Sequence, residues 1–143
     1  GEQSSLAEAE ARALESLIRT GEGADALQQA QLMLDKVAHE GPVSLLPLLH
    51  RIRGWALAQQ GDLAGANAAF TTSLQQATEL RARADIALAL DALTKVAEDR
   101  ADDAAREVAE ERDAMFGLLG IESVPPVPLA LVPAQAARPV ALV

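Results

Sequence analysis

Cysteine and tyrosine are absent from this sequence, and aromatic residues of any kind make up only 2% of its 143 residues. Without cysteine the chain has no disulfide, no thiolate nucleophile and no cysteine ligand for zinc or an iron–sulfur cluster. With so few aromatic residues, the core has to be built from alanine, leucine, valine and isoleucine, which favours closely packed helices over a sandwich of broad β side chains. The composition therefore predicts an all-α protein.

Clustered positive charge is also lacking, since the formal net charge is −9. Nucleic acids and anionic membrane surfaces bind clustered lysine and arginine, so neither is expected as a partner. No basic-then-apolar leader is visible, and no apolar run approaches the roughly 18 residues that span a bilayer. We expect a cytoplasmic protein, with residues 1–4 as a disordered start or a remnant of cloning.

Two helices folded against each other are predicted between Leu48 and Leu80. Gly54 is small enough to let a neighbouring helix approach the first of them closely. Gly61 suits the left-handed residue that ends a helix, and Asp62 can cap the next one. The apolar stripe of the first helix contains Leu49, Ile52, Ala56 and Leu57. The facing stripe of the second contains Leu63, Ala66, Ala69, Phe70, Ser73, Leu74 and Ala77.

Helices of the same kind are predicted on both sides of this central pair. Ser5 and Glu8 form a capping box that starts the first helix near Leu6, and Ser44 is a candidate cap for the third, with Pro47 in its first turn. The three predicted pairs span about 5–41, 44–80 and 82–118, within an array over 5–120, and a Pro-rich extended tail follows over 121–143.

Superposing the three pairs reveals a weak internal repeat with a period of roughly 40 residues. The breaks Gly21-Glu22, Gly61-Asp62 and Arg100-Ala101 take equivalent places in this superposition. The aligned sets are Leu14, Gly54 and Leu93; Leu17, Leu57 and Val96; Ala26, Ala66 and Ala105; and Ala30, Phe70 and Ala109. Three pairs in one register indicate a helical repeat array.

The small and aromatic positions of the central pair resemble a tetratricopeptide repeat. The residues that carry the resemblance are Gly54, Leu57, Gly61-Asp62, Ala66, Phe70 and Leu74. The resemblance implies three antiparallel helix pairs stacked as a short right-handed solenoid. The repeat here is longer than the family's roughly 34 residues, and the closing proline is absent around Thr78, so lengthened helices are expected.

Two stretches are similar to the C-terminal end of large actinobacterial signalling proteins: HRIRGWALAQQGDLAGANAAFTTSLQQA and EERDAMFGLLGIESVPPVPL. In those proteins a nucleotide cyclase or transcription-factor domain precedes an ATPase module and a tetratricopeptide-like tail. The similarity implies a protein–protein or interdomain interaction module of a bacterial regulator, whose catalytic domains lie in other segments.

In arrays of this family the first helices of each pair line a concave groove. The resemblance therefore implies that the groove is lined by Leu48, Arg51, Trp55 and Gln59, by Glu8, Glu15 and Arg19, and by Leu90 and Thr94. Trp55 beside Arg51 would supply an apolar anchor and a carboxylate-binding fork. The alternative is that Trp55 only fills space between pairs. Free volume beside these residues would favour binding, and their packing under the tail would favour a structural role.

Catalytic and metal-binding patterns are missing from the sequence. It has no Ser/His/Asp arrangement, P-loop or dinucleotide-binding glycine motif, so we expect no enzyme and no cofactor. His39 and His50 flank a turn without a third ligand at a defined spacing, and the acidic run 99–113 lacks the glycine and alternation of a calcium loop. No metal site is expected.

The tail is apolar but broken by prolines, so it needs a surface to cover. Residues 124–143, with Leu129, Leu131 and Val132, would either fold back along the last helices or lie in the groove of a neighbouring molecule and form a homodimer. The leading function is an interaction module that binds a protein segment or other domains of its own polypeptide. The alternatives are a small-metabolite sensor with its ligand near Trp55, and a purely structural cap of a longer array.

Overall fold

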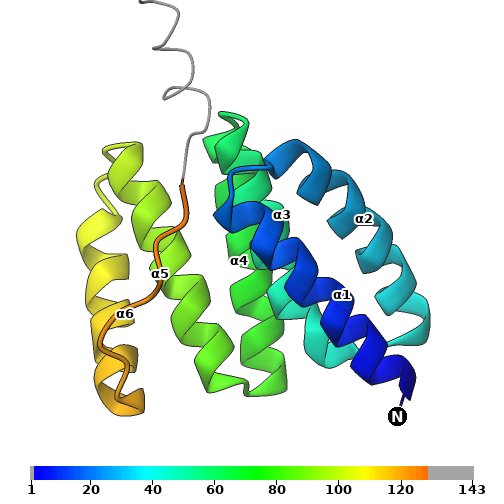
Figure 1. The fold of residues 1–143 in the computed structure, drawn as a ribbon. Coiled ribbons are helices and arrows are strands. Elements are labelled where there is room, and N and C mark those ends of the chain that lie inside the picture. The colour runs from blue at the N-terminus through cyan, green and yellow to red at the C-terminus, as the bar shows by residue number, and fades with distance from the viewer. Residues whose placement is uncertain (1, 129–143) are drawn as a thin grey trace, which may run out of the picture.

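The computed structural model describes residues 2–128, and every regular element in that range is a helix (Figure 1). The elements are α1 (Glu2–Arg19), α2 (Gly23–Glu40), the short 3-10 helix η1 (Val43–Leu45), α3 (Leu46–Gln59), α4 (Leu63–Leu80), α5 (Arg83–Asp99) and α6 (Ala105–Leu119). The all-α prediction is therefore confirmed. Within the described range, no helix has both the length and the apolarity that crossing a bilayer requires.

Each helix packs against the next one along the chain, and Figure 1 shows α2 to α6 following one another across the molecule. α3 also contacts both α1 and α5, so these three helices form one continuous face. After α6 the chain turns back, and residues 121–128 pass along α5 without regular structure (Figure 1). This arrangement places α1, α3, α5 and the end of the described chain around a common space.

Small residues let the helices approach closely, as the shortage of aromatic residues predicts. A Cβ atom at Gly54 would lie only 2.4 Å from Cε1 of Phe70, so the ring of α4 packs directly on the backbone of α3. The Phe70 ring also meets the Trp55 ring edge-on, with 4.8 Å between their centroids. Alanines complete these interfaces with no exposed surface, among them Ala26, Ala30, Ala56, Ala66, Ala69, Ala87 and Ala92.

Residues with a positive φ angle recur at intervals of 19 or 20 positions. They are Gly21, Gly41, Gly61, Arg81, Ala101 and Gly120. After five of them the next amide closes the helix end in the same way, by donating to the carbonyl five residues earlier. The pairs are Glu22 to Leu17, Asp62 to Leu57, Ala82 to Ala77, Asp102 to Ala97 and Ile121 to Phe116. Such a bond, from the residue after a left-handed one back into the last turn, is a common helix C-cap. All the helices that end this way therefore stop at a regular spacing.

The third break lies one residue later than the sequence superposition placed it. The left-handed residue is Ala101 and the capping amide belongs to Asp102, so the break is Ala101-Asp102 rather than Arg100-Ala101. The residues equivalent to Gly54 and Leu57 are accordingly Thr94 and Ala97, not Leu93 and Val96. The third break contains no glycine to fix its position, and the apolar positions around it were compatible with both registers.

Two predicted helix starts also differ from the structure. α1 begins at Glu2, so Ser5 lies inside the helix and does not cap it, because the polar residues before it also favour helix. Ser44 belongs to η1, and α3 has no side-chain cap. Pro47 does lie in the first turn of α3, as predicted.

Asp62 caps α4 as predicted: its Oδ1 accepts a hydrogen bond of 2.8 Å from the Gly65 amide. Replacing Asp62 with alanine is expected to lower the free energy of unfolding by about 1 kcal/mol, because that amide loses its partner. Urea unfolding measures the change. Asp25→Ala is the control, since Asp25 lies in the first turn of α2 without capping it; equal losses in both variants would contradict the assignment of the cap.

Candidate functional site

A cavity of about 250 Å³ lies between α1, α3, α5 and the chain end after α6. We call this space the groove. Its apolar wall consists of Ile18, Leu48, Ile52, Trp55 and Leu88. Its charged side chains are Arg12, Glu15, Arg19, Arg51 and Asp91, and Val124, Pro125 and Val127 close it from the C-terminal side. The groove thus combines a hydrophobic floor with charged edges, which is the usual character of a binding cleft.

Most of the predicted groove residues on α1 and α3 take the expected place. Arg19, Leu48, Arg51 and Trp55 line the cavity, as does Glu15. Glu8 lies beside Leu48 in a neighbouring depression, and Gln59 is fully buried beyond the groove.

The residues predicted from α5 lie elsewhere. Leu90 and Thr94 are buried in the helix packing, where the Thr94 hydroxyl donates a 2.8 Å hydrogen bond to the Leu90 carbonyl. α5 lines the groove with Leu88 and Asp91 instead. These lie 40 positions after Leu48 and Arg51, so the one-residue error at the third break accounts for the wrong choice.

Trp55 takes part in both the core and the groove. Only 8% of its surface is exposed, and one side of its ring packs against Phe70. Another side faces the cavity. The two roles that the sequence left open, filling space and lining a groove, are therefore combined in one side chain.

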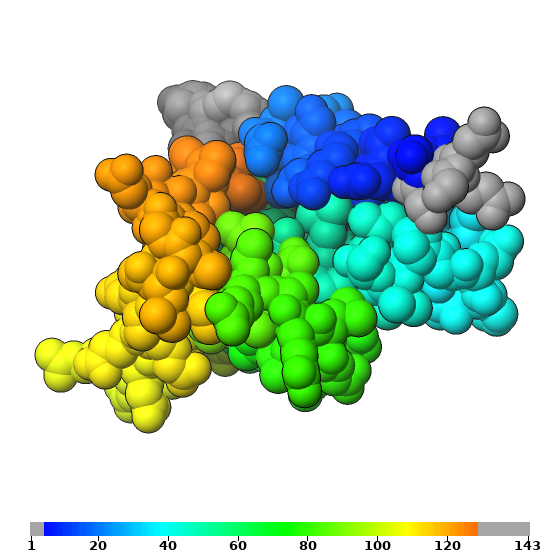
Figure 2. All heavy atoms as spheres, turned by 90° about the horizontal axis from the view of Figure 1, so that it is seen from below, coloured from blue at the N-terminus to red at the C-terminus, as the bar shows by residue number. Residues whose placement is uncertain are grey.

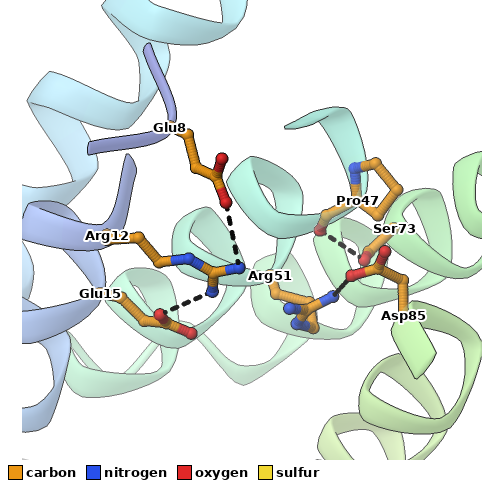
Figure 3. A network of polar contacts seen from close by, with 7 residues as sticks. All are labelled: Glu8, Arg12, Glu15, Pro47, Arg51, Ser73 and Asp85. Atoms are coloured by element: carbon orange, nitrogen blue, oxygen red, sulfur yellow. Dashed lines mark hydrogen bonds and ion pairs between the residues drawn. The ribbon is translucent and has the colours of Figure 1, made fainter. Parts of the chain in front are cut away.

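Arg51 is nearly buried and already has a carboxylate partner. Its Nη1 donates to Oδ1 of Asp85 at 2.8 Å, which joins α3 to α5 (Figure 3). On the opposite wall, Arg12 bridges Glu8 and Glu15 within α1 at 4.0 and 3.1 Å. Part of the predicted carboxylate-binding fork is thus used inside the protein.

Asp91 lines the groove, although it was not among the predicted groove residues. Its carboxylate is 4% exposed and pairs with Lys95 at 2.8 Å and with Arg112 of α6 at 3.3 Å. A buried carboxylate needs such partners, because burying a charge without a partner is strongly unfavourable. Asp91 therefore fixes α6 against α5 at the edge of the groove. In the correct repeat register, Asp91 of α5 is the residue equivalent to Arg51 of α3, and both line the groove.

The chain end that closes the groove is held by Gln59. Residues 121–128 are called the strap below. The Gln59 side-chain amide donates one hydrogen bond of 2.7 Å to the Ile18 carbonyl of α1 and another of 2.9 Å to the Pro128 carbonyl of the strap. Val127 packs against the hydrophobic core, and Figure 2 shows the strap (orange) beside α1 (blue). The predicted tail residues Leu129, Leu131 and Val132 lie outside the described residues.

His50 is partly buried on α3, and within residues 2–128 its Nδ1 atom has no hydrogen-bond partner. Burial lowers its pKa from the ordinary value of 6.5, and the nearby Arg53 lowers it further. The unfolded chain therefore takes up a proton at a higher pH than the folded chain does. Stability at this position is complete above pH 6.5 and is lost as the pH falls through 6.5 towards the folded-state pKa.

Replacing His50 with glutamine is expected to reduce the loss of stability between about pH 7.5 and pH 5.5, because the proton uptake by the unfolded state is removed. Urea unfolding at several pH values measures this slope. The matched control is His39→Gln, at the exposed second histidine. A slope that is unchanged by His50→Gln would show that other groups cause the pH dependence.

The two criteria set by the sequence give different answers for different residues. Free volume lies beside Trp55 and Arg51, whereas Gln59 is packed under the strap. Among residues 2–128, no three His, Cys, Asp or Glu side chains gather closely enough to hold a metal ion. Comparison with protein-family models, with curated proteins and with solved structures finds no match to this chain.

Proposed function

We propose that this chain is a non-catalytic protein-interaction module in which the groove between α1, α3 and α5 holds an extended protein segment. In this proposal the helices form three antiparallel pairs, stacked as a short tetratricopeptide-like solenoid at the end of a bacterial signalling or transcriptional regulator. The regular spacing of the residues with a positive φ angle supports a repeat, because each helix and its turn then occupy the same length of chain.

The observation that carries the proposal is the strap itself. It is a segment without regular structure, with prolines at 125, 126 and 128, and it lies in the groove of its own chain. Val124 and Val127 supply apolar contacts, and Gln59 binds a backbone carbonyl. Extended, proline-containing ligands are commonly recognised in this way, by an aromatic-lined groove and a few hydrogen bonds to the backbone.

The pairing of charges around the groove supports a non-catalytic role. Arg51 is paired with Asp85, Arg12 with Glu15, and Asp91 with Lys95 and Arg112. A general acid or base has to lie within hydrogen-bond reach of the substrate proton that it moves. Paired side chains of this kind instead fix the shape of the groove walls.

The test uses the full chain with Val127→Asp, which places a charge where the strap packs against the core and should release the strap from the groove. A synthetic peptide with the sequence of residues 121–128 is then titrated into this variant by calorimetry. We expect saturable binding, and no binding of a control peptide that carries aspartate in place of Val127. Circular dichroism checks that the variant keeps its helices. A folded variant that binds neither peptide would refute the groove as a binding surface.

A further inference from the structure

The strap does not fill the groove that it covers. A cavity of about 250 Å³ remains next to Val124 and Val127, the two strap side chains that face inwards beside Pro125. Close packing normally leaves few voids larger than a water molecule, so this space could hold larger side chains. The fit between strap and groove is therefore incomplete.

The strap is also weakly attached through its backbone. Within residues 2–128 it makes two hydrogen bonds to the rest of the protein. The Ile121 amide donates to the Phe116 carbonyl at the end of α6, and the Pro128 carbonyl accepts from the Gln59 side-chain amide. Its three prolines have no amide proton to donate. Five of its eight residues are exposed: Glu122, Ser123, Pro125, Pro126 and Pro128.

We propose that the strap occupies the groove of its own chain until a partner displaces it. The partner is an extended apolar segment that presents leucine-sized side chains at the positions of Val124 and Val127. This inference rests on the proposed function, and it adds the chemistry of the partner and the competition with the strap. The partner gains affinity from the unfilled volume that the two valines leave.

The expected preference follows from the burial of methylene groups. One additional buried methylene improves binding about fourfold, so leucine at both positions should bind about 15-fold more tightly than the strap sequence itself. The strap, however, is linked to the groove covalently and acts at an effective concentration on the order of millimolar. A free peptide with the sequence of the strap therefore competes poorly, whereas the leucine peptide competes at about 15-fold lower concentration.

The experiment follows the strap in the full chain. Because the chain has no cysteine, Pro126→Cys gives a single attachment site for a nitroxide label on an exposed strap residue. Electron paramagnetic resonance then reports the mobility of the strap during titration with the peptides IESVPPVP and IESLPPLP. A label at Leu118→Cys, on the exposed face of α6, is the control that should not respond.

We expect both peptides to increase the mobile fraction at position 126, and IESLPPLP to reach half of its maximal effect at about 15-fold lower concentration than IESVPPVP. Equal concentrations for the half-maximal effect would overturn the preference for larger side chains. A strap that stays immobile, while both peptides bind the Val127→Asp chain, would overturn displacement and leave the proposed function standing. Failure of both peptides to bind the Val127→Asp chain would refute the proposed function as well.

Discussion

Replacing Gly54 with alanine is expected to lower the free energy of unfolding by about 2 kcal/mol. The new Cβ would lie 2.4 to 2.9 Å from three atoms of the Phe70 ring, and a buried ring between two helices cannot move aside without disturbing Trp55. Overpacking of this kind costs up to about 3 kcal/mol, from which the higher helix propensity of alanine recovers about 1 kcal/mol. Urea unfolding monitored by circular dichroism measures the difference.

The same substitution at Gly117 is the matched control, because a Cβ there meets nothing within 4 Å. Gly117 lies inside α6, so alanine is expected to stabilise the protein by about 1 kcal/mol. In a Phe70→Leu background, the penalty of Gly54→Ala should shrink, since the two residues are in contact and their effects couple. A stabilising effect of Gly54→Ala would contradict the close packing of α3 on α4.

Replacing Gln59 with leucine is expected to destabilise the protein by about 2 kcal/mol, through the loss of two hydrogen bonds. Gln59 has no exposed surface, and its amide satisfies the carbonyls of Ile18 and Pro128. Each lost hydrogen bond costs about 1 kcal/mol, since the Ile18 carbonyl keeps the Gly21 amide as a donor and Pro128 is exposed to water. The Gln59 Oε1 atom has no partner within the described residues, so its removal offsets part of that loss. Urea unfolding again provides the measurement.

Gln60→Leu is the control for this prediction. Gln60 is exposed, and its amide reaches only the Ala56 carbonyl of its own helix, at 3.3 Å. We expect a change within about 0.5 kcal/mol at this surface position. If Gln59→Leu were as mild as Gln60→Leu, Gln59 would not connect α1, α3 and the strap.

The features that the sequence predicted correctly are those decided by neighbouring residues. Gly61 and Asp62 specify the end of one helix and the start of the next, and both act as expected. Gly54 predicted a close approach by its small size alone, although its partner Phe70 lies on the next helix. Local chemistry of this kind is visible in a single sequence.

The register of the third pair was not visible in the same way. Ala101 adopts the left-handed conformation that glycine adopts at positions 21 and 61, and an alanine gives no sign of this in the sequence. The break was therefore placed one residue early, and the groove positions Leu88 and Asp91 on α5 were missed.

The role of Gln59 could not have been predicted either. Its two acceptors lie 41 and 69 positions away along the chain, so only the folded structure brings them together. The resemblance placed Gln59 in the groove as a ligand contact. Its contact in the structure is with the chain's own strap.

The most direct test of the account is acrylamide quenching of Trp55, the only tryptophan of the chain, in the wild-type protein and in Val127→Asp. If the strap covers a groove that Trp55 lines, the wild-type quenching constant should be low and should rise several-fold in the variant, with helicity unchanged. Adding the strap peptide to the variant should lower it again. Equal quenching in the two proteins would mean that Trp55 belongs to the core alone and that the strap does not cover a binding groove.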